Sequence, residues 1–80
     1  MNDTTTTTTY TTSDLNLAAF LMTQGQPLEG VSRDGPRLVF SFPAQARAVT
    51  PGYYSGATVQ ARAFANALRD LKALIRETKN

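Results

Sequence analysis

The sequence is short, weakly basic, and free of cysteine and histidine, and these properties exclude several classes of protein. Eighty residues suffice for one small domain, whose stability is marginal unless tight packing or self-association adds to it. Without cysteine there is no disulfide framework, and without cysteine or histidine there is no zinc site of the usual kind. We therefore predict no metal and no cofactor.

The net charge of +2 is distributed unevenly along the chain. The residues before Pro43 carry two basic and four acidic side chains, whereas those from Pro43 onward carry six basic and two acidic ones. Such asymmetry indicates either a basic end that binds a polyanion or two ends through which neighbouring subunits attract each other.

The N-terminal segment, residues 1–11, is predicted to be a disordered tail, because its threonine run Thr4–Thr9 has nothing to bury. Threonine also favours extended backbone, so an edge strand formed in the presence of a partner is the alternative. The segment lacks the charged and then apolar pattern of a secretory leader, and the longest apolar run, Leu17–Met22, is too short to cross a bilayer. We expect a soluble, cytoplasmic protein with no membrane partner.

A first helix is predicted from about Asp14 to Gln24. Thr12 or Ser13 can serve as its N-cap, and Asp14 then places a negative charge in the first turn, where the helix dipole favours it. Gly25 follows as the residue that ends the helix in a left-handed conformation.

Apolar side chains cover most faces of this first helix. A helix of that kind is normally buried on more than one side, and a domain this small has few other elements to cover it. The pattern therefore predicts a homodimer, with self-association through Leu17, Phe20 and Leu21.

A β-hairpin is predicted next, with strands over Leu28–Arg33 and Arg37–Phe42 joined by the strong turn signal Asp34-Gly35. Alternate residues of the second strand are apolar, so one face of the hairpin should be buried; they are Leu38, Phe40 and Phe42.

The hairpin register stays open, because Pro36 cannot donate a ladder hydrogen bond and complicates the turn. A loop of three residues pairs Val31 with Val39, and a loop of two or four residues pairs Val31 with Leu38.

Residues 43–57 form the least regular segment, in which Ala44–Val49 is predicted to be a short helical turn and residues 50–52 a turn. Tyr53 and Tyr54 fit half-buried positions with their hydroxyls in water. They also fit stacking on the bases of a single-stranded nucleic acid.

A last helix is predicted from about Val59 to Lys79, with Thr58 as its N-cap, because the segment contains no glycine or proline and is rich in helix formers. Helical spacing places one apolar stripe along it, formed by Ala61, Phe64, Leu68, Leu71 and Ile75.

These elements predict an α+β fold in which residues 12–80 form a single α-β-β-α domain. The simplest architecture has two layers, with both helices on one face of a two-stranded antiparallel hairpin. Because a lone two-stranded hairpin is weak, pairing of hairpins across a dimer would add stability.

Three groups of residues resemble parts of a small domain family of unknown function from bacteria and their phages. The first is Tyr10-x-Thr12-x-Asp14-Leu15, followed by Ala18-Ala19-Phe20-Leu21 and Gly25; the others are Val39-Phe40-Ser41-Phe42 and Ala67-Leu68-x-x-Leu71-Lys72-x-x-Ile75. The resemblance covers about residues 10–77. It implies a bacterial or phage setting and a compact α-β-β-α unit, and it transfers no functional residue, because the family has no assigned activity.

Basic residues recur at steps of seven along the last helix and form a row on a face other than the apolar stripe. The possible nucleic-acid-binding residues are Arg62, Arg69, Lys72, Arg76 and Lys79. The row also fits an ordinary solvated helix face. No base-reading motif accompanies it, so any contact should be with backbone phosphates.

No catalytic residue is predicted, because histidine and cysteine are absent and the carboxylates have simpler structural positions. We expect no enzymatic activity and no small-molecule substrate. The sequence instead favours a small interaction or assembly domain that self-associates, and the alternative is a nucleic-acid-binding protein that uses the basic face of its last helix.

Overall fold

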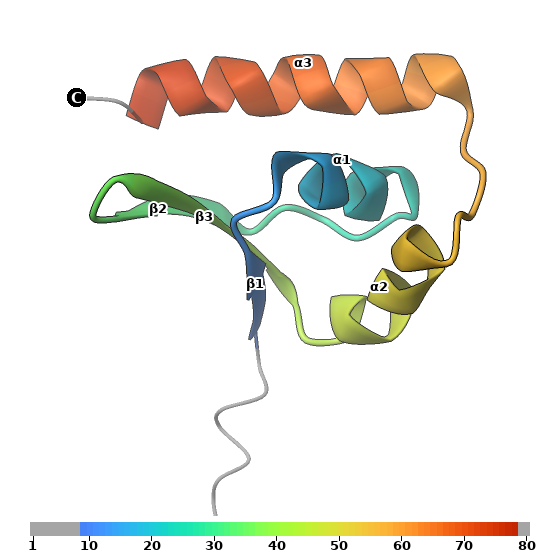
Figure 1. The fold of residues 1–80 in the computed structure, drawn as a ribbon. Helices are drawn as coiled ribbons and strands as arrows, with labels where there is room; N and C mark the ends of the chain where they lie inside the picture. The colour runs from blue at the N-terminus through green and yellow to red at the C-terminus, as the bar shows by residue number, and fades with distance from the viewer. Residues whose placement is uncertain (1–8, 79–80) are drawn as a thin grey trace, which may run out of the picture.

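Residues 9–78, the part of the chain that the computed structural model describes, form three helices and one three-stranded antiparallel sheet (Figure 1). The predicted α+β class is confirmed. In chain order the elements are β1 (Thr9–Thr12), α1 (Leu15–Thr23), β2 (Gly30–Asp34), β3 (Arg37–Pro43), α2 (Ala46–Tyr54) and α3 (Ala61–Thr78).

β1 lies at one edge of the sheet, whose strand order is β1-β3-β2. Tyr10 pairs with Phe42 and Thr12 with Phe40, so both β1 residues share the face of the sheet that carries the buried phenylalanines. The predicted tail over residues 1–11 is therefore wrong for residues 9–11, and residues 1–8 lie outside the described residues. The two-stranded architecture is also wrong, because β1 extends the sheet.

β2 and β3 form the predicted hairpin with a loop of two residues, which was one of the predicted lengths, but the pairing of Val31 with Leu38 that we assigned to this loop is wrong. Val31 lies opposite Phe40, which leaves a loop of Gly35 and Pro36 between the strands. The φ angle of Gly35 is 64°, as the first central residue of a type II′ turn requires. Pro36 lies in the loop, where its missing N–H removes no ladder hydrogen bond.

The N-cap of α1 is Asp14, and not Thr12 or Ser13 as predicted. The carboxylate of Asp14 accepts hydrogen bonds from the backbone N–H groups of Asn16 and Leu17, at 3.0 and 3.2 Å. At the other end, the predicted left-handed glycine is confirmed, since Gly25 has a φ angle of 85°.

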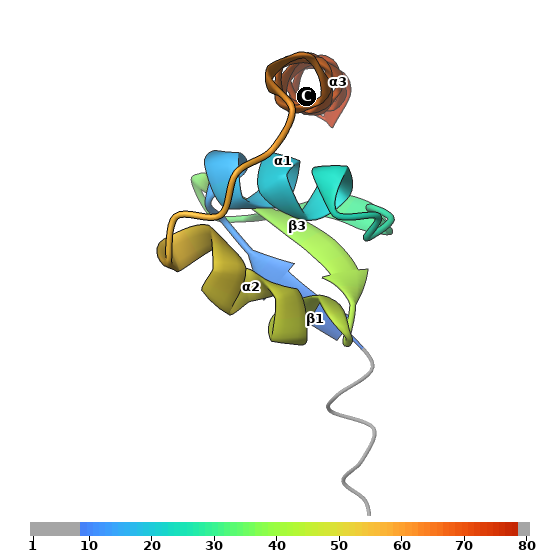
Figure 2. The same ribbon diagram turned by 90° about the vertical axis from the view of Figure 1, so that its right-hand side faces the viewer.

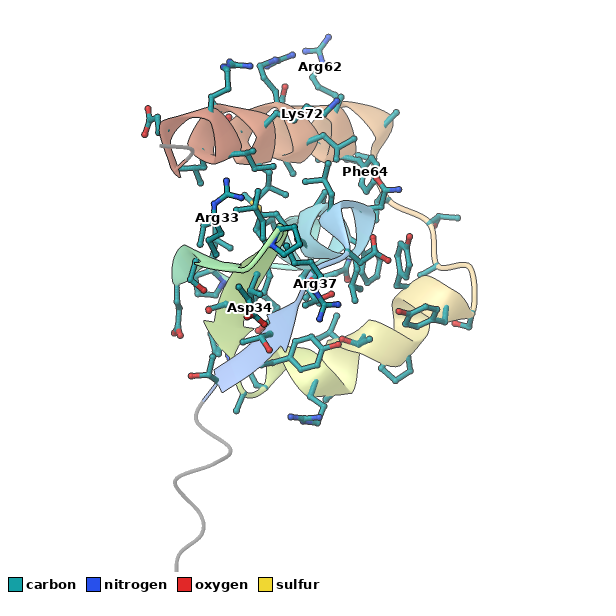
Figure 3. The ribbon with its side chains drawn as sticks, turned by 60° about the vertical axis from the view of Figure 1, so that its left-hand side comes forward. Arg33, Asp34, Arg37, Arg62, Phe64 and Lys72 are labelled. Carbon is teal, nitrogen blue, oxygen red and sulfur yellow. The ribbon has the colours of Figure 1, made fainter. Side chains whose placement is uncertain are left out.

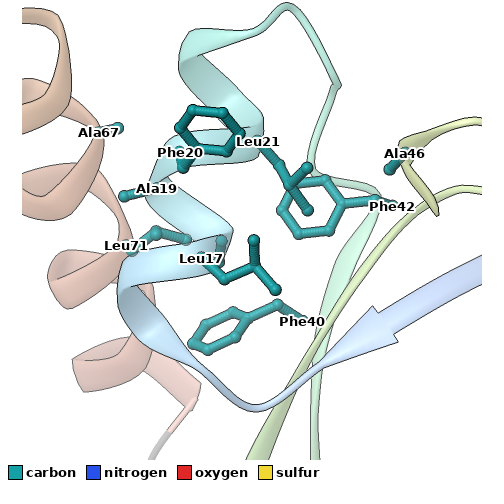
Figure 4. Close-up of a cluster of buried hydrophobic side chains, with 10 residues drawn as sticks. Leu17, Ala19, Phe20, Leu21, Phe40, Phe42, Ala46, Ala67 and Leu71 are labelled. Atoms are coloured by element: carbon teal, nitrogen blue, oxygen red, sulfur yellow. The ribbon is translucent and has the colours of Figure 1, made fainter. Parts of the chain in front are cut away.

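One side of α1 packs on the sheet. Leu17 and Leu21 point toward Phe40 and Phe42 of β3, and all four side chains are almost completely buried (Figure 4). The prediction that one face of the hairpin is buried is thus confirmed, because the apolar face of β3 packs against α1.

The opposite side of α1 is covered by α3, so α1 is a middle layer between α3 and the sheet (Figure 2). Ala19 faces the part of α3 that contributes Ala67 and Leu71 (Figure 4), and each of these side chains is buried. The predicted layering, with both helices on the sheet, is therefore wrong. Small alanines on both helices allow the close approach that this third layer needs.

α2 continues through Thr50-Pro51-Gly52, so the turn predicted there is wrong. The hydroxyl of Thr50 donates a hydrogen bond to the carbonyl oxygen of Ala46 at 3.1 Å. Tyr53, near the end of α2, packs its ring on Phe20 of α1 with centroids 5.6 Å apart. Such tertiary contacts outweigh the helix-breaking tendency of proline.

α3 begins at Ala61, later than the predicted start at Val59. The carbonyl oxygen of Gln60 accepts the first helical hydrogen bond, from the N–H of Phe64 at 3.0 Å. Gln60 is therefore the N-cap residue of α3, the role that we predicted for Thr58.

Deleting residues 1–10 is expected to lower the melting temperature relative to a chain that lacks only residues 1–8, because it removes Tyr10 from β1. The Tyr10 ring lies 5.3 Å from the guanidinium carbon of Arg47 and is half-buried opposite Phe42. A loss of about 1–2 kcal/mol corresponds to roughly 4–16 °C for a domain of this size. Circular dichroism melts measure the difference, and equal melting temperatures would contradict a stabilising role for β1.

Candidate functional site

The basic residues of α3 gather on one side of the helix, which we call the basic flank and define as Arg62, Arg69, Lys72 and Arg76. A helix turns by 100° per residue, so positions seven apart drift by only about 20°. All four side chains are exposed, and Arg62 points away from the core while Phe64 points toward α1 (Figure 3). The fifth predicted residue, Lys79, lies outside the described residues.

The acidic residues of α3, Asp70 and Glu77, project from the helix about 100° around its axis from the centre of the basic flank. Within residues 9–78, no carboxylate comes within ion-pair distance of the four cations. Arg69 instead donates a hydrogen bond from Nη1 to Oδ1 of Asn66 at 3.0 Å. The positive charge of the basic flank is therefore not neutralised by the described part of the chain.

A shallow hollow of about 390 Å³ lies along the basic flank. Its lining contains Ala65 and Leu68 together with three of the cations, Arg69, Lys72 and Arg76. Because Ala65 has a short side chain, it leaves room between the longer basic ones. The hollow brings three cations to one concave surface, and Arg62 lies outside it.

Arg33 of β2 is a further cation near α3, but it lies on the side of the helix that faces the hairpin, whereas Arg62 points away from that side (Figure 3). Arg33 is therefore not part of the basic flank. Its partner in the sheet is Leu38, so Arg33 is on the same face as Val31. The two-residue spacing between Val31 and Arg33 indicated from the sequence that both lie on one face of the strand. Only the structure shows that α3 covers that face.

The residues predicted for self-association do not form a surface. Leu17, Phe20 and Leu21 are 1%, 3% and 0% exposed within a single chain. Their prediction as interface residues is therefore wrong for this fold: α3, the sheet and α2 supply the cover that we assigned to a second copy. The apolar character of α1 reflects its position as a middle layer.

Sites of other kinds find little support in the described part of the chain. No group of three or more acidic, histidine or cysteine side chains within residues 9–78 is placed to hold a metal ion. None of the helices α1, α2 and α3 combines the length and the apolar character needed to cross a membrane. The basic flank is consequently the strongest concentration of charge for which a partner can be argued.

Comparison with known proteins does not identify the chain. No family model, no curated protein and no solved structure matches it. The resemblance to a bacterial and phage domain family stays a prediction.

Proposed function

We propose that this protein is a non-enzymatic binding domain that holds the phosphate backbone of a nucleic acid against the basic flank of α3. The observation that supports this proposal is the separation of charge on α3. Four exposed cations share one side of the helix, and its two carboxylates project about 100° away from them around the axis, on a separate strip of the surface. A cytoplasmic location, expected from the sequence, would place the protein beside nucleic acids.

The chemistry of the basic flank suits phosphate. Three of its four cations are arginines, whose planar guanidinium groups donate two parallel hydrogen bonds to a phosphate. The hollow beside Ala65 allows a phosphate to approach Arg69, Lys72 and Arg76 together. Backbone contacts carry no sequence information directly, so we expect binding that is largely independent of sequence.

Binding to duplex DNA is expected to weaken steeply with salt. Each phosphate neutralised contributes about −0.9 to the slope of log K against log salt, so four contacts give a slope of roughly −3.6. Fluorescence anisotropy of a labelled random duplex, titrated at several salt concentrations, measures the slope. Absence of binding at about 50 mM salt and tens of micromolar protein would return the basic flank to a solvated surface.

Self-association is the second candidate function, and the surfaces that would support it are the two edges of the sheet and not the apolar residues of α1. Within residues 9–78, β1 and β2 each pair with one strand only, so both leave an edge to which a second copy can add a strand. β1 carries no charge and no proline, the usual protections of an exposed edge. Light scattering after size exclusion distinguishes a monomer of 8.7 kDa from a dimer of twice that mass.

A further inference from the structure

A second hollow is lined by residues of β1, of α2 and of the C-cap of α2. β1 and α2 lie on the other side of α1 from α3 (Figures 1 and 2). We call this hollow the β1–α2 groove. Its volume is about 580 Å³, within the range of sites for small ligands. The residues that line it are Tyr10, Arg47, Thr50, Pro51, Tyr54 and Ser55.

Tyr54 presents an aromatic ring to solvent at one wall of the groove. Its side chain is 70% exposed, an unusual state for so large a ring in a small domain. The ring is nevertheless held in place, because Tyr53 meets it edge-on with centroids 5.1 Å apart, and Tyr53 itself packs on Phe20 in the core. A ring fixed in this way loses little conformational entropy when a ligand stacks on it.

Tyr10 and Arg47 form another part of the wall, with the guanidinium carbon 5.3 Å from the ring centroid. No carboxylate lines the groove, and no carboxylate among residues 9–78 pairs with Arg47, so its charge is available to an anion. The hydroxyls of Thr50 and Ser55 both donate to backbone carbonyls of α2, at 3.1 Å. Their oxygens therefore face a ligand chiefly as hydrogen-bond acceptors.

We propose that the β1–α2 groove binds one nucleotide unit of a single-stranded nucleic acid. The base stacks on Tyr54, and the adjoining phosphate contacts Arg47. An exposed aromatic ring beside an unpaired arginine is the combination that single-strand-binding surfaces use, because every base offers a flat face and every link a negative charge. A duplex cannot engage the groove in this way, since its bases are stacked on each other.

This inference extends the proposed function to a second surface, and its test separates the two. The probe is a fluorescein-labelled oligothymidylate of about ten nucleotides, a length that spans an ordinary single-strand site. Tyr54→Ala is expected to weaken its binding roughly 5- to 150-fold, the effect of losing one stacked base. Tyr54→Phe keeps the ring and should bind like the original protein. Neither substitution should change binding of a random duplex, which depends on the basic flank.

Arg47→Gln supplies an independent measurement, because it removes the proposed phosphate contact and leaves Tyr54 in place. We expect the salt slope for the oligothymidylate to become less steep by about 0.7, the contribution of one phosphate contact on a single strand. Unchanged binding by Tyr54→Ala, or no binding of the oligothymidylate at about 50 mM salt, would overturn the inference. Free thymidine monophosphate binding as tightly as the oligonucleotide would also overturn it, since the groove would then hold a nucleotide and not a strand.

Discussion

Leu17→Asp is expected to leave the protein unfolded at room temperature. Leu17 is 1% exposed and lies between α1 and Phe40 of the sheet (Figure 4). Removing a buried leucine side chain alone costs about 2–5 kcal/mol, and a buried charge without a partner costs several more. The whole stability of an 80-residue domain is about 4–12 kcal/mol, so little or none should remain. Far-ultraviolet circular dichroism and a thermal melt measure the outcome.

Asn16→Asp is the matched control for this substitution. It introduces the same charge at the adjacent residue, but Asn16 is exposed and lies in the first turn of α1, where the helix dipole favours a negative charge. We expect its melting temperature to be equal or slightly higher. A folded monomer of Leu17→Asp would contradict the three-layer fold, because it would place Leu17 at a surface between copies.

The alternation of β3 and the glycine that ends α1 could be predicted because they depend on neighbouring residues. Phe40 and Phe42 mark the buried face at a spacing of two, and Gly25 marks a helix end by its own backbone freedom. These features need no knowledge of the rest of the chain, and the structure contains them where the sequence places them.

The position of α3 could not be predicted, because it depends on which surface of α1 remains after the sheet has packed on it. Ala19 reads as apolar whether it faces a helix of the same chain or a second copy. The error in the predicted interface followed from this ambiguity. Sequence periodicity reports that a face is buried and does not report what buries it.

β1 was missed, and α2 (Ala46–Tyr54) was predicted only as a short helical turn over Ala44–Val49, for a related reason. Tyr10 is the only large side chain of β1, and its partner Phe42 lies far along the chain, so local alternation carries no signal. In α2, Pro51 reads locally as a turn, whereas Tyr53 holds the segment against Phe20 as a helix. Residues of β1 and α2 line the β1–α2 groove, so the sequence indicated Tyr54 as a stacking residue but did not indicate Arg47 beside it.

The basic flank, by contrast, could be predicted residue by residue, because one helix contains all of its members. The spacing of Arg62, Arg69 and Arg76 fixes their common side once the segment is helical. The hollow at Ala65 could not be predicted, because its shape depends on how the side chains around it pack.

Arg69→Gln/Arg76→Gln is expected to weaken duplex binding roughly 50- to 100-fold at about 0.1 M salt, since each phosphate contact contributes nearly a factor of ten there. The salt slope should fall from about −3.6 to about −1.8. Both side chains are exposed and glutamine is a good helix former, so the melting temperature should change little. Anisotropy titrations of the same labelled duplex provide the comparison.

Two controls distinguish contact at the basic flank from a general effect of charge. Arg37→Gln removes an exposed cation on β3, away from α3, and is expected to leave binding nearly unchanged. Arg69→Gln/Asp70→Asn keeps the net charge at +2, yet it should still weaken binding close to tenfold, because only Arg69 lies on the basic flank. If the Arg37 variant weakened binding as much as the Arg69 variants, the protein would attract DNA through its overall charge. In that outcome α3 would have no special part in binding.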